Sequence, residues 1–238
     1  MSPRMNGPRQ EPRPVWILAL DASLARCSAA VQADAAIRAQ RLLEADRGQA
    51  AALPPMAQAV LREAGIAATD LDAVAAVVGP GSFTGIRAAL ALAQGVALAA
   101  SLPVLGVTTG EALAAALPVA ARSGRSVWSV VDNRRGRVIL ERFAAGAAAA
   151  DGLPEVHEID ALPLPGGPVV LVGDAAERVA AALAARGAEA EASASRQPEA
   201  AAVARVAALR LTGRLPPLAA RPLYVEPPAV RQPLASPA

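Results

Sequence analysis

The architecture of the first half of the chain depends on the turn Gly79-Pro80-Gly81-Ser82-Phe83-Thr84-Gly85-Ile86-Arg87, which joins an apolar run to a long helical pattern. Its glycines allow close backbone approach or positive φ angles, and either Ser82 or Thr84 can cap the following helix. Free N–H groups at such a helix start can bind an anion. The turn is not a P-loop, because the spacing differs and the chain contains no lysine. A purely structural turn and a phosphate-binding turn both stay open at this point.

Apolar segments on either side of this turn predict a regular succession of strands and helices. The strands are expected at residues 15–23, 27–32, 37–44, 71–78 and 103–107. One helix is expected to end at Gly65, and a second runs from the turn to about Ala100. The order strand-strand-strand-helix-strand-helix-strand describes an RNase H-like half, with which each lobe of the actin and sugar-kinase class begins.

A second half begins near Val127 and repeats the opening of the first. Residues 127–143 again have the pattern of strand, acidic residue, tight turn and strand. Asp174 and Glu177 form a capping-box pattern for a helix that reaches Arg186. Further expected segments are a strand at 168–172, a helix at 199–211, and loops at 144–165 and 188–198.

This order of elements predicts an α/β fold, specifically a two-lobed actin-like (ASKHA, RNase H-like) fold with mixed sheets. The expected domains are a disordered tail at 1–14, an N-terminal RNase H-like lobe at 15–108, a C-terminal lobe at 109–220 and a Pro-rich tail at 221–238.

Composition excludes several kinds of site. The chain has no lysine, so Schiff-base chemistry is impossible. His157 is the only histidine, which excludes a His-pair metal site, and the single Cys27 excludes an internal disulfide. A net charge of +2 and an aromatic content of 2% argue against tight independent RNA binding.

The hydrophobic content of 54% does not predict a membrane protein, because much of it is alanine. The longest apolar segment, residues 86–105, is interrupted by Arg87, Gln94 and Pro103. We therefore expect a soluble, cytoplasmic protein.

Residues 79–109, GPGSFTGIRAALALAQGVALAASLPVLGVTT, closely resemble the signature of the bacterial TsaB family, also called YeaZ. Three further blocks resemble family motifs and occur in the family's order. They are ILALDAS at 17–23, VVDNRRGRVIL at 130–140 and RPLYVEP at 221–227.

The chain departs from the family pattern at several polar positions. The family often has His followed by Ser or Thr where this chain has Arg47-Gly48-Gln49. The second hairpin and the tail differ as well: Asn133 replaces Ala, Arg137 replaces Glu, Ile139 replaces Tyr and Glu226 replaces Arg. Any polar role of those positions in the family is not transferred to this chain.

The resemblance implies a non-catalytic scaffold or dimerisation subunit. Such a subunit supports a TsaD-type catalytic subunit, together with a TsaE-type ATPase, in forming N6-threonylcarbamoyladenosine at position 37 of tRNAs reading ANN codons. It implies contact with tRNA only through the complex, and no cofactor held by this chain alone, with ATP and Mg²⁺ candidates at the complex interface. We also expect a homodimer when the chain is isolated. No catalytic residue and no metal ligand is expected.

Small residues on the helix after the turn form a ridge that suits close helix pairing. The resemblance implies a partner interface at Leu53, Met56, Val60, Arg87, Ala88, Ala91, Gly95 and Ala99. The alternative, favoured by periodicity alone, is that both helices use these residues to pack on their own sheet.

Asp21 and Ser23 end the first strand, where actin-like phosphotransferases carry phosphate-loop residues. The candidate nucleotide or anion site is Asp21, Ser23, Gly81, Ser82 and Thr84. Asp132 is the equivalent residue in the second half. A stand-alone actin-like ATP-dependent phosphotransferase is therefore the alternative function, and a glycoprotease-like peptidase is the weakest one.

Overall fold

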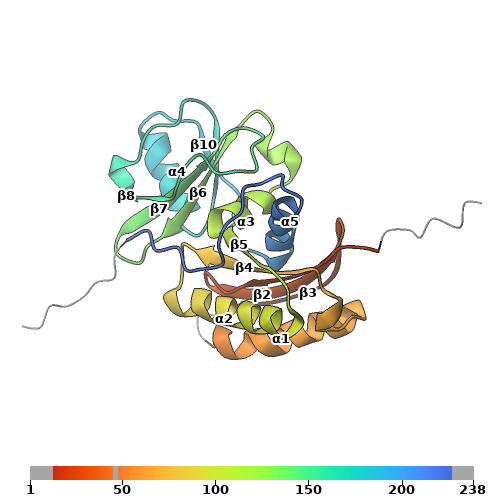
Figure 1. The fold of residues 1–238 in the computed structure, drawn as a ribbon. Coiled ribbons are helices and arrows are strands. Elements are labelled where there is room, and N and C mark those ends of the chain that lie inside the picture. Colours follow the sequence, from red (N-terminus) through yellow and green to blue (C-terminus); the bar gives the residue numbers. More distant parts are fainter. Residues whose placement is uncertain (1–12, 45–47, 227–238) are drawn as a thin grey trace, which may run out of the picture.

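Two five-stranded mixed sheets form the centres of two lobes in the computed structural model, which describes residues 13–44 and 48–226 (Figure 1). The first sheet has the order β3-β2-β1-β4-β5. Its strands are β1 (Trp16–Asp21), β2 (Arg26–Ala33), β3 (Ala36–Glu44), β4 (Ala73–Gly79) and β5 (Val104–Thr108). The first three form an antiparallel meander, and β4 and β5 run parallel to β1. This is the predicted RNase H-like order.

Helices cover both faces of the first sheet. On one face lie α1 (Gln49–Ala64) and α2 (Phe83–Ala100), with the short η1 (Ala68–Asp70) between them in sequence (Figure 1). On the other face lies α5 (Ala200–Leu211). The strand β4 is buried along its whole length because Val74, Ala76 and Val78 face α1 and α2, while Ala75 and Val77 face α5.

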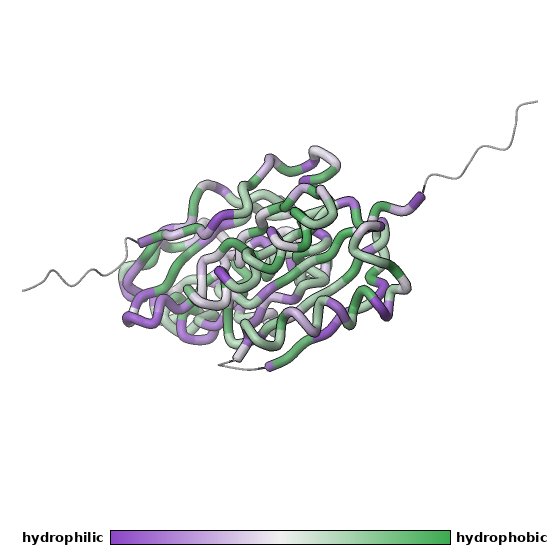
Figure 2. Tube along the Cα trace, turned by 60° about the horizontal axis from the view of Figure 1, so that its bottom comes forward, coloured by the Kyte–Doolittle hydropathy of each residue, from purple (hydrophilic) through white to green (hydrophobic). Residues whose placement is uncertain are grey.

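The second sheet has the order β10-β9-β6-β7-β8. Its strands are β6 (Ser126–Asp132), β7 (Arg137–Phe143), β8 (Glu155–Glu158), β9 (Val169–Val172) and β10 (Ala190–Ala192). The helices of this part are α3 (Thr109–Ala116), η2 (Val119–Arg122), η3 (Ile159–Ala161) and α4 (Ala176–Ala185). α4 covers one face through Val179 and Leu183, and α3 covers the other through Leu113. Apolar residues run through the central strands, and polar residues gather towards the periphery (Figure 2).

The second lobe is smaller than the predicted range of 109–220. Helix α5 packs on the first sheet, and Ala219 forms a bridge with Leu105 of β5. Residues 200–223 therefore return to the first lobe. The physical reason is that the apolar face of β1 and β4 opposite α1 and α2 needs a cover, and the small side chains of α5 provide it.

Several local predictions were wrong. The capping box at Asp174 and Glu177 does not form, because Oδ1 of Asp174 accepts a hydrogen bond from the Asp132 N–H instead. The two expected loops contain β8 and β10, and His157 lies in β8. The predicted elements did not include α3.

Helix α2 is long and apolar enough to span a membrane by length and composition alone. In this fold its buried residues Ile86, Ala89, Leu90 and Ala93 pack on the first sheet. Part of the apolar surface of α2 is therefore buried in the core of the first lobe.

Candidate functional site

A cleft of about 880 Å³ lies between the two lobes. The first lobe contributes the β1–β2 turn and the start of α2, and the second contributes the β6–β7 turn. The C-terminal segment at residues 222–226 forms a further wall. Of the candidate nucleotide residues, Ser23, Gly81 and Ser82 line this cleft.

Asp21 lies beneath the cleft and is fully buried. Its Oδ1 accepts hydrogen bonds from the Ser23 N–H at 3.0 Å and the Ser23 hydroxyl at 2.7 Å. Burial raises the pKa of Asp21 to about 6, although these two bonds act in the opposite direction. Oδ2 has no hydrogen-bond partner among the residues that the structure describes. The carboxylate thus holds the β1–β2 turn and does not contribute to the cleft wall.

Asp132 holds the β6–β7 turn of the second lobe as Asp21 holds the β1–β2 turn of the first. Its Oδ1 accepts from the Arg134 N–H at 2.8 Å, which is again the amide two residues further on. Oδ1 of Asn133 accepts from the N–H groups of Arg135 and Arg137 at 2.9 and 3.0 Å. These three amides are therefore bound by the chain's own side chains. A phosphate would have to displace those bonds to use this turn.

The Gly79–Arg87 turn is packed against the end of β1. Ser82 caps α2 by accepting from the Gly85 N–H at 3.2 Å, and its own N–H donates to the Ser23 carbonyl at 2.6 Å. A Cβ added at Gly81 or Gly85 would overlap the carbonyl oxygens of Ser23 or Ala22. The glycines thus allow close packing, which supports the structural interpretation of the turn. Thr84 is exposed and is not part of the cleft lining.

The small-residue ridge of α2 faces outward. Arg87, Ala91, Gly95 and Ala99 are exposed, and Ala88 is half-buried. A Cβ added at Gly95 would meet no described atom within 4 Å. For this ridge, the expectation that it packs on its own sheet is wrong.

In α1, by contrast, two of the three residues assigned to the partner interface are buried. Leu53 and Val60 are buried in the core under the first sheet, so they are not available to a partner. Their assignment to a partner interface is therefore corrected. Met56 is half-buried, with its sulfur 3.7 Å from that of Cys27. The period of a helix marks an apolar face, but it does not tell whether the chain itself covers that face.

An aromatic cluster at the start of α2 extends the exposed ridge. The Arg87 guanidinium lies 3.7 Å from the centre of the Phe83 ring, and its Nε and Nη2 donate to the Tyr224 hydroxyl at 3.0 and 2.7 Å. Phe83 is 57% exposed and Tyr224 is 54% exposed, and Leu98 further along α2 is 84% exposed. We call Phe83, Arg87, Ala91, Gly95, Leu98, Ala99 and Tyr224 the α2 face. The sequence patterns did not reveal the contribution of Tyr224.

Within residues 13–44 and 48–226, no group of three or more His, Cys, Asp or Glu side chains is arranged to hold a metal ion. His157 lies 3.2 Å from Glu155 on the same strand.

Known proteins resemble this chain in sequence and in fold. A family model described as "TsaD: tRNA N6-adenosine threonylcarbamoyltransferase" matches residues 43–214. The tRNA threonylcarbamoyladenosine biosynthesis protein TsaB of Escherichia coli is 42% identical over 93 residues, which are 39% of this chain and 40% of that protein. The TsaB of Buchnera aphidicola is 38% identical over 94 residues, or 44% of its length. The matched part thus spans less than half of these curated relatives.

The structural match is broader. YeaZ from Pseudomonas aeruginosa superimposes with a TM-score of 0.76 at 28% identity, covering 88% of this chain and 99% of that one. The predicted actin-like fold class is therefore confirmed, and so is the resemblance to the TsaB (YeaZ) family. On these grounds the chain belongs to the TsaB (YeaZ) family, within the wider group that the TsaD family model describes.

Proposed function

We propose that this chain is a non-catalytic subunit that docks on a TsaD-type catalytic subunit and supports the formation of N6-threonylcarbamoyladenosine at position 37 of tRNAs reading ANN codons. A TsaE-type ATPase completes the complex, and tRNA meets this chain only through it. We expect the complex in the cytoplasm. The names of the relatives support the reaction, and the observation that carries the docking role is the exposed α2 face.

The α2 face has the chemistry of a protein interface. Tyrosine and arginine are enriched where proteins bind one another, and Tyr224 and Arg87 lie together at one end of the face. Beyond them, Ala91, Gly95 and Ala99 leave the helix backbone open to a close neighbour, since interaxial distances depend on the side chains at the contact. A helix of a related subunit fits this surface.

Two features of the chain support a non-catalytic role. The chain has a single histidine, so it cannot supply a pair of histidine ligands to a metal ion on its own. In addition, the turns that would hold a nucleotide phosphate use their amides internally, at Ser23 and Arg134.

A stand-alone ATP-dependent phosphotransferase is the second candidate, and the cleft of about 880 Å³ is the observation that favours it. Calorimetry of the isolated chain with Mg-ATP separates the two proposals. We expect no saturable binding by the isolated chain, with ATP and Mg²⁺ bound only at the interface of the complex. Saturable binding that is weakened in the Asp21→Asn variant supports the phosphotransferase instead.

The docking role is tested with a bulky residue on the α2 face. Gly95→Trp is chosen because no described atom lies within 4 Å of the Cβ position at Gly95, so the new side chain starts from open space. The matched control is Ala181→Trp on the exposed side of α4. We expect Gly95→Trp to weaken binding to the TsaD-type subunit at least about tenfold. The control should bind like the unmodified chain.

Activity is tested in a reconstituted reaction. It contains the catalytic subunit, the ATPase, the enzyme that makes the threonylcarbamoyl adenylate, threonine, bicarbonate, ATP and tRNA. We expect the modified nucleoside only when the chain is present, and less of it with Gly95→Trp than with Ala181→Trp. Equal modification in the absence of the chain would contradict the proposed function, and modification of tRNA by the chain alone would contradict its non-catalytic role.

A further inference from the structure

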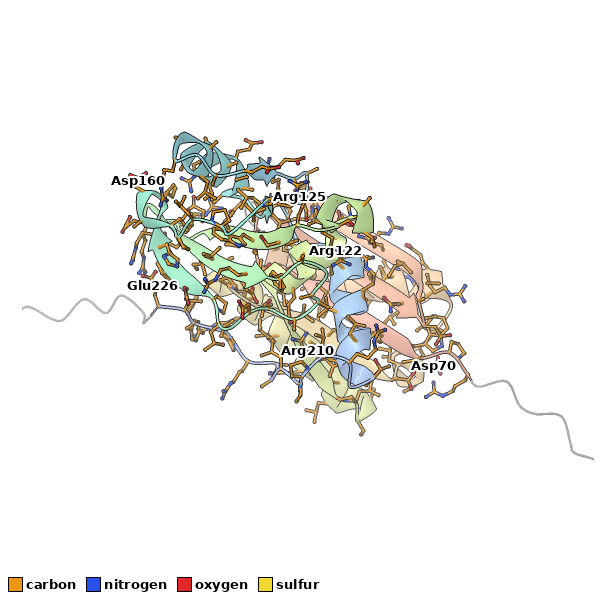
Figure 3. The ribbon with its side chains drawn as sticks, turned by 90° about the horizontal axis from the view of Figure 1, so that it is seen from above. Asp70, Arg122, Arg125, Asp160, Arg210 and Glu226 are labelled. Atoms are coloured by element: carbon orange, nitrogen blue, oxygen red, sulfur yellow. The ribbon has the colours of Figure 1, made fainter. Side chains whose placement is uncertain are left out.

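The C-terminal segment crosses the cleft from one lobe to the other. It is attached to the first lobe where the Leu223 N–H donates to the Val78 carbonyl at 2.8 Å and Gln94 Nε2 donates to the Ala220 carbonyl at 3.1 Å. Glu226 then lies beside the strands of the second lobe (Figure 3). We call residues 222–226 the strap.

An ion pair holds the far end of the strap. Nη2 of Arg137 on β7 lies 2.5 Å from Oε1 of Glu226. Asn133 in the β6–β7 turn donates from Nδ2 to Oε2 of the same carboxylate at 3.1 Å. The Arg137 and Glu226 side chains are 32% and 23% exposed, so most of each is shielded from water. Glu226 is therefore bound by two groups of the second lobe.

The same strap delivers Tyr224 to the α2 face. Its hydroxyl accepts both hydrogen bonds from Arg87, and its ring lies 6.2 Å from that of Phe83, measured between centroids. Tyr224 stands between the attachment at Leu223 and the ion pair at Glu226. Its position on the α2 face thus depends on both ends of the strap.

We propose that the Arg137–Glu226 ion pair is a latch that keeps the strap across the cleft and thereby holds Tyr224 in the surface on which the partner docks. The identity of that partner, a TsaD-type subunit, rests on the proposed function. The latch itself is independent of the proposed function.

Three variants test the latch: Arg137→Glu, Glu226→Arg and the double exchange of both. Tyr224 is the only tyrosine, so incorporated fluorotyrosine gives a single fluorine resonance that reports on this ring. We expect each single reversal to move the resonance towards the position of fluorotyrosine in water. The double exchange should return it towards its original position, with a remaining displacement because the carboxylate placed at position 137 then faces Glu158 of β8, whose Oε1 lies 3.7 Å from Nε of Arg137. Glu177→Arg, at an exposed ion pair on α4, is the control and should leave the resonance unchanged.

Affinity for the TsaD-type subunit tests the docking role of the strap. We expect each single reversal to weaken binding by about threefold to tenfold, and the double exchange to restore it to within about twofold. A resonance that stays in place in both single variants, or does not recover in the double one, overturns the latch. A resonance that moves while affinity stays constant overturns the docking role of Tyr224. If the unmodified chain does not bind the catalytic subunit, the proposed function fails and the docking role with it, while the resonance still decides the latch.

Discussion

Gly85 and Gly95 lie on the same helix and face different surroundings. A Cβ at Gly85 would overlap the Ala22 carbonyl oxygen, whereas one at Gly95 would point into open space. We expect Gly85→Ala to lower the free energy of unfolding by about 2–4 kcal/mol, because the turn must move away from β1. Gly95→Ala should raise it by up to about 1 kcal/mol through helix propensity. Urea denaturation of both variants measures these changes in the free energy of unfolding. Equal changes in the two variants would show that Gly85 is not tightly packed against β1.

Glu141 is a buried carboxyl between the lobes. It lies on β7, where Oε1 accepts from the Thr108 hydroxyl of the first lobe at 2.8 Å. Oε2 has no hydrogen-bond partner among the described residues. Burial, and secondly the negative charge of Glu111, raise the pKa of Glu141 to about 8.

A raised pKa means that the folded state favours the protonated acid. The stability that this gives is fully present below the ordinary pKa of 4.5, and it is lost as the pH rises through about 8. Between pH 5 and pH 9 we expect the unmodified chain to lose about 2–4 kcal/mol relative to Glu141→Gln, whose amide does not ionise. Other groups, including Asp21, titrate in both proteins, so the difference isolates Glu141. Parallel stability profiles across this pH range would contradict the assignment.

At the scale of elements, α5 is fixed to α3 by an ion pair in the interior. Nη2 of Arg210 lies 2.6 Å from Oε1 of Glu111, and both side chains are almost fully buried. Arg210→Met leaves the Glu111 carboxylate without its counter-charge, so we expect a loss of about 3–5 kcal/mol. The double variant with Glu111→Met should lie within about 2 kcal/mol of the unmodified chain. Chemical denaturation measures both, and a double variant that is less stable than the single one would contradict this account.

The regular elements could be predicted from sequence because their patterns are strong. The five strands of the first sheet and the helices α1 and α2 follow from apolar runs and from glycines such as Gly65, which adopts a φ of 71° at the end of α1. Helix α3 was missed, although Thr108 and Glu111 form a true capping box. The strands β8 (Glu-Val-His-Glu) and β10 (Ala-Glu-Ala) were missed because they are short and contain only one residue that favours strands, Val156.

The placement of α5 could not be predicted, because alanine on most of its sides gives no direction to its apolar face. Contacts between residues far apart in the sequence could not be predicted either, because no local pattern links the two partners. Arg87 and Tyr224 are 137 residues apart, and Arg137 and Glu226 looked like two unrelated departures. In the candidate site, Ser23 of the strand-end pattern lines the cleft, and its role in binding a nucleotide or anion stays a prediction. The pattern could not show that Asp21 lies below the surface.

At the scale of the whole molecule, the α2 face is exposed in the isolated chain, and we predict that two copies associate through it. A two-fold axis would place α2 against its own copy, as it would be placed against a subunit of similar fold. We expect a solution mass of twice 23.9 kDa, which the Gly95→Trp variant halves and Ala181→Trp leaves unchanged. Analytical ultracentrifugation over a range of concentrations decides this. A monomer at the highest concentrations would count against the prediction.

The return of α5 to the first sheet affects how the protein matures on the ribosome. Ile17, Ala19, Ala75 and Val77 are synthesised early, yet the helix that shields them lies near the end of the polypeptide. While the second lobe is still emerging from the exit tunnel, we expect this apolar face of the first sheet to be exposed to solvent. We therefore expect stable folding of the earlier lobe only after residues 200–211 have been translated. For the same reason, an excised fragment of residues 15–108 would lack one layer of its own structure.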